Sequence, residues 1–282
     1  MATVTLEHVS YIYEQDTPFE VKALDDVCLT VQSGTITGII GHTGSGKSTM
    51  VQLFNGLEKP NAGRILLDGV DIWQDPRAMR ELRFRVGLVM QYPEYQLFEE
   101  SVRADIAFGP RNMGLSDTEV AIRVDEAARL VGLTPAELDK SPFDLSGGQK
   151  RRAAIAGIMA MRPEVLVLDE PAAGLDPRGR DAILSAIRAY GQQTGATVII
   201  VSHSMEDMAA YCDHIVVMSH ARVFLSGTRD EVFAHADELE SVGLDVPQIT
   251  HLAQELARRG VRLKGGIYTV EAALAALLPQ FQ

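Results

Sequence analysis

The sequence predicts an α/β protein, and two observations support this prediction. Short runs of β-branched and aliphatic residues alternate with longer stretches whose apolar residues recur at helical spacing. Two of the short runs, residues 165–168 and 198–201, are apolar throughout, as expected of strands buried on both faces of a parallel sheet. With 282 residues, 46% of them hydrophobic and 23% charged, the chain has enough apolar surface for one large domain with an appendage.

Turn residues and apolar spacing define the expected elements. The expected strands span residues 4–6, 27–31, 35–40, 86–90, 165–168, 197–201 and 215–218, and turn residues around a short strand indicate a β-hairpin within 60–72. The expected helices span residues 47–55, 116–131, 147–161, 179–190, 248–259 and 270–278. In the second of these helices, Val120, Val124, Ala127 and Val131 recur at the spacing of one helical face.

The composition changes after residue 227. Residues 230–245 contain six acidic residues and no Lys or Arg, a run that is by itself typical of a solvated face. The helix expected next has Pro247 in its first turn and Gly260 after its end. We therefore expect one domain over residues 1–227 and a small appended domain over 228–282 that contributes to dimerisation.

Charge and cysteine content exclude several function classes. The chain has 26 Lys and Arg against 38 Asp and Glu, a net charge of −12, which disfavours binding to nucleic acid or to anionic lipid. No apolar run approaches the ~20 residues of a membrane span, and the first residues lack the layout of a signal peptide. The two cysteines, Cys28 and Cys212, fit a reducing compartment. We expect a cytosolic protein that another chain must hold if it works at a membrane.

Residues 41–48 (GHTGSGKS) match the pattern G-x-x-x-x-G-K-[ST], directly after an expected strand and at the start of an expected helix. Glycines allow backbone N–H groups to converge on phosphate oxygens, and the helix directs its positive end to the same point. Lys47 can reach the β- and γ-phosphates, Ser48 can bind Mg²⁺, and Thr49 is placed for the α-phosphate. The predicted nucleotide contacts of this loop are Gly41, Thr43, Gly44, Ser45, Gly46, Lys47, Ser48 and Thr49.

Two carboxylates, Asp169 and Glu170, follow the apolar strand over 165–168. A parallel strand delivers its C-terminal residues to the sheet edge at which the phosphate loop lies. Asp169 can hold Mg²⁺ there, directly or through water, and Glu170 can orient and polarise an attacking water. For this pair alone a strand that ends in a polar turn is an equal explanation, but the phosphate loop favours the catalytic interpretation.

Residues 145–149 (LSGGQ) are explained locally as a helix start, because Ser146 and Gln149 can form a capping box. The position of these residues relative to the other motifs is more informative. The phosphate loop, this pentapeptide, the two carboxylates, residues 174–176 (GLD) and a strand that leads to His203 follow one another in this order. In that order, over residues 4–227, the chain resembles the ATP-binding-cassette (ABC) ATPases. The resemblance implies a RecA-like sheet, an antiparallel β subdomain and a helical signature subdomain over about residues 92–160.

The resemblance also implies roles for single residues. Tyr13 corresponds to the aromatic residue that stacks on adenine, with a half-buried strand tyrosine as the alternative. Gln91 corresponds to a glutamine that contacts Mg²⁺ or the lytic water, Asp176 to a loop at the dimer interface, and His203 to a histidine at the γ-phosphate rather than in the core. The implied catalytic residues are Glu170, His203 and Gln91; the implied Mg²⁺ ligands are Ser48, Gln91 and Asp169; and the implied signature contacts are Ser146, Gly147, Gly148 and Gln149.

One copy of each motif provides half of two composite sites. In ABC ATPases the signature contacts the γ-phosphate of ATP on a second subunit, and the helix that begins at Ser146 would direct its dipole to that anion. The resemblance therefore implies a dimer, either with a second copy of the chain or with a close paralogue.

A transporter motor fits better than other ABC classes. About 100 residues without sustained heptads separate Lys47 from Ser146, which disfavours the coiled-coil ATPases of chromosome maintenance and DNA repair. The single acidic cassette disfavours translation factors. Residues 92–102 (YPEYQLFEESV) and 105–110 (DIAFGP) are similar to the ATPases of energy-coupling-factor transporters, and His42 and Thr43 resemble the second of the two paralogous ATPases.

That similarity implies import of vitamins or of cobalt or nickel ions, at the cytoplasmic face of the cell membrane. It implies a membrane coupling protein that docks near residues 91–105 and a separate membrane protein that captures the substrate. The segment combines the apolar residues Tyr92, Tyr95, Leu97 and Phe98 with the acidic residues Glu94, Glu99 and Glu100. We expect the three acids to receive a basic amphipathic helix. The alternative for this segment is that its aromatic residues are core of the helical subdomain and its acids the solvated face. The alternative for the whole chain is an ABC-fold scaffold or regulator without a transport role.

Overall fold

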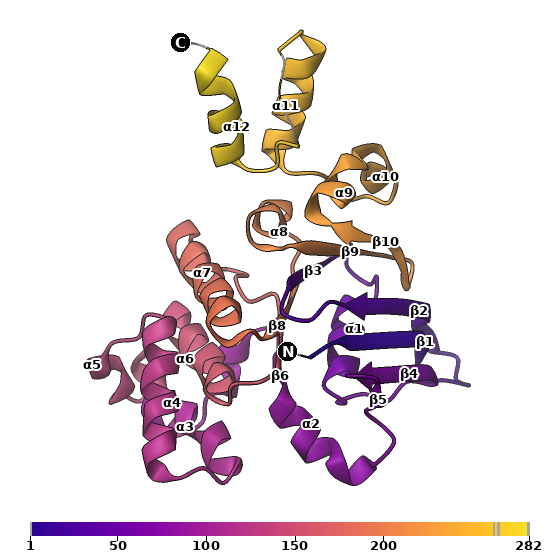
Figure 1. Cartoon of the computed structure of the whole chain (residues 1–282). Coiled ribbons are helices and arrows are strands. Elements are labelled where there is room, and N and C mark those ends of the chain that lie inside the picture. Colours follow the sequence, from indigo (N-terminus) through magenta and orange to yellow (C-terminus); the bar gives the residue numbers. More distant parts are fainter. Residues whose placement is uncertain (1, 262, 264–265, 281–282) are drawn as a thin grey trace.

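The computed structural model describes residues 2–261, 263 and 266–280, and its centre is a six-stranded sheet (Figure 1). The strand order is β10-β9-β3-β8-β7-β6, in which β10 is antiparallel to β9 and the other five strands are parallel. The bounds are β3 Ile36–Ile40, β6 Val86–Val89, β7 Val165–Asp169, β8 Thr197–Val201, β9 His214–Ser219 and β10 Arg222–Thr228. The parallel strands all end at one edge, and the candidate site lies there.

A four-stranded antiparallel sheet lies beside α1 and next to the larger sheet (Figure 1). Its order is β2-β1-β4-β5, with the bounds β1 Val4–Tyr13, β2 Val21–Val31, β4 Ala62–Leu67 and β5 Val70–Asp71. The first two strands are longer than predicted, because paired registers extend them to Tyr13 and Val21.

Twelve α-helices occur in the described part of the chain. They are α1 Lys47–Phe54, α2 Met79–Arg85, α3 Val102–Asn112, α4 Asp117–Leu130, α5 Pro135–Leu138, α6 Gly147–Ala160, α7 Pro177–Thr194, α8 Met205–Tyr211, α9 Arg229–Ala234, α10 Ala236–Ser241, α11 Gln248–Arg258 and α12 Val270–Leu277. Short 3₁₀ turns span Pro76–Ala78, Pro93–Gln96, Pro142–Asp144 and Leu278–Gln280. Helices α3 to α6 form a group on one side of the larger sheet, and α11 and α12 stand apart at the opposite end of the molecule (Figure 1).

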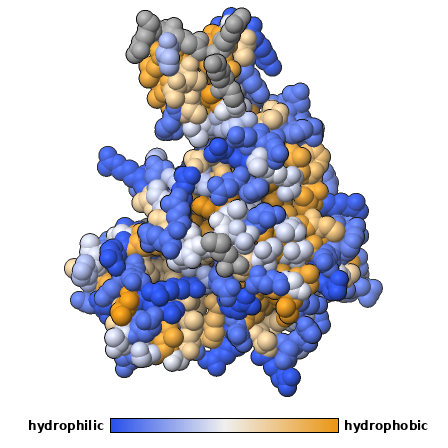
Figure 2. All heavy atoms as spheres, viewed as in Figure 1, coloured by the Kyte–Doolittle hydropathy of each residue, from blue (hydrophilic) through white to orange (hydrophobic). Residues whose placement is uncertain are grey.

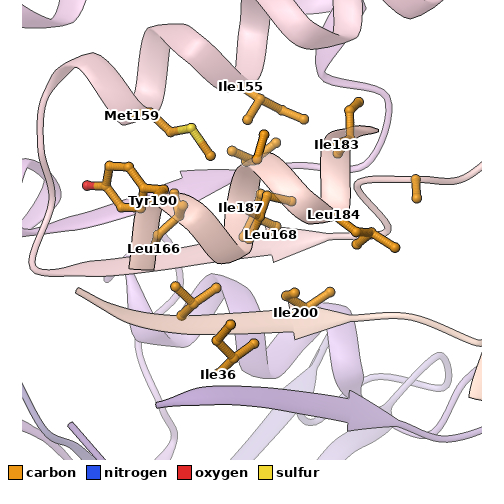
Figure 3. Close-up of a cluster of buried hydrophobic side chains, with 14 of the residues drawn as sticks. Ile36, Ile155, Met159, Leu166, Leu168, Ile183, Leu184, Ile187, Tyr190 and Ile200 are labelled. Atoms are coloured by element: carbon orange, nitrogen blue, oxygen red, sulfur yellow. The ribbon is translucent and has the colours of Figure 1, made fainter. Parts of the chain in front are cut away.

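Two hydrophobic cores cover the two faces of the larger sheet. Alternate side chains of a strand point to opposite faces, so Leu166 and Leu168 of β7 join one core while Val165 and Val167 join the other. Figure 3 shows the first core, in which strand side chains such as Leu168 and Ile200 meet Ile155 and Met159 of α6 and Ile187 and Tyr190 of α7. Helix α1 and the antiparallel sheet supply the second core.

The α/β prediction is confirmed, and each expected strand and helix is present. Helices α2, α3, α5, α8, α9 and α10 and strand β10 were not predicted. In α3 the apolar periodicity is weakened near its end by Gly109 and Pro110, and Gly109 packs so closely on Met161 that a Cβ would lie 2.6 Å from Met161 Cγ. Strand β10 is an edge strand without a buried residue, so it lacks the apolar run of its neighbours.

The residues that follow the predicted domain boundary pack onto the main body of the protein. Thr228 caps α9, and Phe233 and Leu239 belong to the same buried cluster as the strands of the larger sheet. The appended domain over 228–282 stays a prediction, because buried residues of its first two helices, α9 and α10, belong to the first core. Pro247 is the N-cap of α11 and not a first-turn residue as predicted, because its ψ of 139° is extended. Among the described residues, no helix is both long and apolar enough to cross a bilayer.

Candidate nucleotide-binding site

Four adjacent parallel strands deliver the predicted functional residues to one edge of the larger sheet. Strand β3 leads into the phosphate loop over 41–46, β8 leads to His203, β7 to Glu170 and β6 to Gln91. The strand order β3-β8-β7-β6 places these four chain segments next to one another. Ligands of open α/β sheets bind at this carboxyl edge.

The phosphate loop requires glycine at two positions, because any side chain there would clash with a neighbouring carbonyl oxygen. Gly41 has φ +154°, and a Cβ there would lie 2.4 Å from the carbonyl oxygen of Met218. Gly46 has φ +100°, and a Cβ there would lie 2.2 Å from the carbonyl oxygen of Ala23. Gly46 is also the N-cap of α1 and offers no capping side chain, so the first amide groups of the helix are left for an anion.

Lys47 folds over the loop it follows. Its Nζ donates hydrogen bonds to the carbonyl oxygens of Gly41, at 2.6 Å, and of His42, at 2.9 Å. Burial lowers the pKa of the Lys47 ammonium, while the charges of Glu170 and Asp169 act in the opposite direction. The side chain is thus a partly desolvated cation held against the loop, and such a cation is a good partner for phosphate oxygens.

Asp169 and Ser48 form the candidate magnesium site. Asp169 is buried, and its carboxylate accepts a hydrogen bond from the Ser48 side chain. Burial raises the pKa of the Asp169 carboxyl group, and the Ser48 hydrogen bond and the Lys47 charge oppose that rise. A carboxylate and a hydroxyl side by side, next to a phosphate-binding loop, are the oxygen donors that Mg²⁺ prefers. The residues present therefore fit this ion.

Glu170 and His203 are paired at the mouth of the site. The backbone of Glu170 is left-handed, with φ +50°, and its amide donates to Val201 O at 2.9 Å. Its Oε1 lies 3.0 Å from Nδ1 of His203, whose side chain is 75% exposed. An L-residue rarely adopts this backbone conformation, so a strained carboxylate at a catalytic edge is itself a functional indicator. The sequence predicted both residues, but not their contact.

Tyr13 lies beside the helix that begins at the phosphate loop. Its hydroxyl is 3.1 Å from Oγ1 of Thr49, its ring makes an edge contact with Tyr11, and it is 37% exposed. The Tyr13 ring is exposed enough to stack on a base, and Tyr13 is also the last residue of β1. Both predicted interpretations, an adenine-stacking residue and a half-buried strand tyrosine, therefore fit this position. Ser45 differs from its loop neighbours, because its amide bonds to His42 O and its hydroxyl is buried without a partner among the described residues.

The signature segment begins α6 on the other face of the sheet from α1. Ser146 and Gln149 form the predicted capping box, and Gln149 Nε2 also donates to Glu137. Gly147 is exposed, and a Cβ there would meet nothing within 4 Å. Asp176 caps α7 by accepting a hydrogen bond from Gly179 N at 2.8 Å. Since α1 and α6 pack in different cores, the signature is not positioned to complete its own chain's phosphate loop.

Comparison with known proteins agrees with this geometry. The model of the ABC transporter family matches residues 24–173. The chain belongs to this family. Among the curated ABC proteins, the chain is 54% identical to the energy-coupling factor transporter ATP-binding protein EcfA2 of Clostridium acetobutylicum over 276 residues, which are 98% of this chain and 96% of the relative. It is 51% identical to EcfA2 of Clostridium tetani, over 99% of this chain and 97% of that one. Within the ABC family it therefore belongs to the energy-coupling factor transporter ATP-binding proteins.

Solved ABC structures show the same fold. The cbiO1 protein of Clostridium perfringens, described as part of the ABC transporter complex cbiONQ, has a TM-score of 0.76 and 40% identity, covering 89% of this chain and 98% of that one. The cassette MJ0796, solved as a dimer in a post-hydrolysis state with ADP and Pi, has a TM-score of 0.73 and 25% identity, covering 80% and 98%. The recognition and the fold class predicted from the sequence are confirmed, and the chain is an ABC ATPase that uses ATP.

In this ABC ATPase the aromatic side chains of the segment after Gln91 are exposed to solvent. Tyr92, Tyr95 and Phe98 are 49%, 84% and 59% exposed, so they do not belong to the core, whereas Leu97 packs against it. Phe98 makes an edge contact with Phe108, which is also exposed. These rings form an apolar surface on the helical subdomain.

The expectation that Glu94 receives a partner is wrong. Its carboxylate forms a two-point ion pair with Arg151 of α6, at 2.8 and 3.0 Å; the Arg151 side chain is buried and the Glu94 side chain is only 16% exposed. Asp105 is likewise turned inward and accepts hydrogen bonds from the amides of Phe98 and Glu99, with its carboxyl pKa raised by burial. Arg151 was missed because it stands between Lys150 and Arg152, and a run of basic residues is usually a solvated face.

Proposed function

We propose that this chain is the ATP-hydrolysing motor subunit of an energy-coupling-factor importer for micronutrients such as vitamins or transition-metal ions. The observation that supports this most directly is the convergence of the phosphate loop, Asp169, Glu170, His203 and Gln91 at the ends of four adjacent strands. The identity to EcfA2 proteins along nearly the whole chain supports the transport role.

ATP would bind with its phosphates on the loop over 41–46 and its base on Tyr13. Lys47 would exchange its two carbonyl contacts for β- and γ-phosphate oxygens, and the free amides at the start of α1 would bind the same anion. Ser48 and Asp169 would hold Mg²⁺, with Gln91 as a further ligand. The ion supplies positive charge that neutralises the phosphate oxygens.

Hydrolysis requires a water aligned with the bond between the γ-phosphorus and the β,γ-bridging oxygen. Glu170 would accept a hydrogen bond from that water while the water oxygen attacks phosphorus and ADP leaves. His203 is held next to Glu170 and would contact the γ-phosphate, so the pair places a polarising carboxylate and a donor on the same reacting group. Lys47 balances the charge that moves to the leaving oxygen.

A dimer would complete both sites. The exposed start of α6, with Ser146, Gly147 and Gly148, offers amide groups and a helix dipole to the γ-phosphate on a second ATPase subunit. The dimeric MJ0796 cassette supports this arrangement. Residues 228–282 would add to the dimer contact, because α11 and α12 expose Leu252, Val270 and Leu274, and Figure 2 shows hydrophobic surface on these helices.

The membrane coupling protein would dock near residues 91–105, holding the chain at the cytoplasmic face of the membrane. After the correction of Glu94, the surface consists of the exposed rings of Tyr92, Tyr95 and Phe98 with Glu99 and Glu100. This combination suits a basic amphipathic helix. A substrate-capture protein would act through that coupling protein and not through this chain.

Co-purification from membranes tests the transport role against that of an ABC-fold regulator. Tagged full-length protein should carry a paralogous or identical ATPase and an integral membrane protein. The double variant Glu99→Lys with Glu100→Lys should lose the membrane protein and keep ATP binding. The matched control is Asp237→Lys with Glu240→Lys, two exposed acids on α10. Isolation without any membrane protein would favour the regulator.

A further inference from the structure

Three metal-ligating side chains outside the nucleotide site converge on the exposed face of the antiparallel sheet. They are His8 of β1 and Asp26 and Cys28 of β2, and one ligand atom from each lies within 4.8 Å of the others. His8 Nδ1 is 2.8 Å from Asp26 Oδ1. All three residues are exposed, so an ion can reach them from solvent.

Two β-bulges create this convergence. Leu6 pairs with Leu29 and Val9 with Val27, so β1 carries one extra residue in this interval, and His8 there has φ +52°. Between the pairs Val9–Val27 and Tyr11–Leu24 the extra residue is on β2, where Asp26 also has φ +52°. The two irregular positions therefore flank a single regular pair on opposite strands.

The regular pair between the bulges sets which way the three side chains point. Val9 and Val27 are buried in the second core. Asp26 and Cys28 flank Val27 along β2 and so point to the opposite, solvent-facing side of the sheet. His8 turns toward them because of its left-handed backbone, and its amide donates a hydrogen bond to Cys28 Sγ at 3.3 Å. That amide holds the sulfur as an acceptor next to the imidazole.

The donor set selects a class of metal. A thiolate, an imidazole and a carboxylate are ligands of Zn²⁺ and of related divalent transition metals, whereas Mg²⁺ prefers oxygen alone. Bonds of about 2.0–2.3 Å in a tetrahedral site place ligand atoms about 3.3–3.7 Å apart. Side-chain rotations of the exposed residues suffice to reach that spacing from the present one.

We propose that His8, Asp26 and Cys28 form a binding site for a divalent transition metal of the Zn²⁺ and Co²⁺ class, with a water as the fourth ligand. The metal takes the place of the proton between His8 Nδ1 and Asp26 Oδ1, which moves to His8 Nε2 through solvent as the imidazole changes tautomer, and the Cys28 thiol releases its proton to solvent on binding. The bound ion links β1, which ends at Tyr13, to β2. This site does not depend on the proposed transport function.

Cobalt provides a direct test, because a thiolate bound to Co²⁺ gives a charge-transfer band that oxygen and nitrogen ligands do not. We would titrate Co²⁺ into the full-length protein without nucleotide and with excess Mg²⁺ to block Ser48 and Asp169. The expected result is one equivalent of Co²⁺ with a thiolate band, displaced by Zn²⁺, which binds such sites more tightly. Cys212 cannot supply the band, because it is fully buried in the core.

Substitution of each proposed ligand tests whether the ion binds at this site. Cys28→Ser should lose the band, and His8→Asn and Asp26→Asn should weaken binding at least about tenfold. Asparagine is chosen because it tolerates a positive φ, so the bulges are preserved, and unchanged melting temperatures without metal would verify this. The control is His235→Asn, which removes an exposed imidazole that also pairs with a carboxylate, Glu238, at 2.8 Å, but has no thiol nearby.

Three outcomes would overturn the proposal. The first is no thiolate band in the parent protein, and the second is full binding by Cys28→Ser. The third is loss of binding in His251→Asn alone, which would place the ion at the cluster of Glu240, Asp245 and His251.

Discussion

Single residues at the strand ends determine what the site can do with ATP. Lys47 is a partly desolvated cation, Asp169 a buried carboxylate and Glu170 a strained one that faces His203. Burial disfavours the charged forms of Lys47 and Asp169, which phosphate oxygens and Mg²⁺ would stabilise, and the left-handed backbone fixes the Glu170 carboxylate at the end of β7.

Lys47→Ala should abolish ATP binding. The change removes the cation that now contacts two loop carbonyls and leaves the γ-phosphate without its side-chain partner. Equilibrium binding of a fluorescent ATP analogue measures the loss, and an unchanged melting temperature of the ligand-free variant serves as the control. Tight binding by the variant would contradict the assignment of this lysine.

Glu170→Gln should bind ATP normally and lower the hydrolysis rate by about 10³-fold, because the amide keeps the size of the side chain but cannot polarise water. With ATP and Mg²⁺ the variant should accumulate as a dimer in light scattering. Hydrolysis at the parental rate would assign the polarising role to another group.

Asp169→Asn should stabilise the ligand-free protein at neutral pH. Burial raises the folded-state pKa of Asp169, so the native state holds the proton more tightly than the unfolded state does. That contribution to stability is fully present below the unfolded pKa and is lost as pH rises through the folded pKa. The variant should therefore melt higher at pH 7 and show less decline between pH 4 and 7, while Mg²⁺-dependent ATP binding weakens roughly tenfold.

At the scale of elements, α6 connects the signature to the segment that follows β6. Arg151 bridges Glu94 in that segment and the carbonyl of Ala173 in the loop after β7. A movement of the segment near Gln91 would thus be transmitted to the helix that begins at Ser146 and to the loop beside Glu170.

Glu94→Ala should destabilise the protein by about 3–5 kcal/mol, because it leaves Arg151 buried without its partner. The double variant Glu94→Leu with Arg151→Met should regain most of this stability. Chemical denaturation measures both, and the exposed Glu100→Ala should change the free energy of unfolding by no more than about 0.5 kcal/mol. A small effect of Glu94→Ala would mean that the ion pair contributes little.

At the scale of the whole molecule, a single chain separates the two halves of an ATP site. The phosphate loop and α1 belong to one core and α6 to the other, on opposite faces of the larger sheet. Closing a complete site therefore needs a second subunit, so that ATP can join two chains.

Gly147→Gln tests this separation. The surroundings of Gly147 are empty in the single chain, so the variant should fold and bind ATP like the parent. In a Glu170→Gln background the new side chain should prevent the ATP-dependent dimer, because it occupies the space of the partner's nucleotide. Size-exclusion chromatography with light scattering distinguishes the two results, and an intact dimer would place the signature outside the interface.

The sequence alone determined the α/β class, the phosphate loop, the carboxylate pair and the capping box of α6, because these features depend on residues that are close in sequence. In these features side chains act on their own backbone, through glycine conformations, strand periodicity and helix caps, so neighbours in sequence carry the information. The tertiary structure alone decided pairings between distant residues. It turned Glu94 toward Arg151, 57 residues away, joined Glu170 to His203 and used two bulges to bring His8 to Asp26 and Cys28. Such contacts depend on strand register and helix packing, which no short stretch of sequence contains.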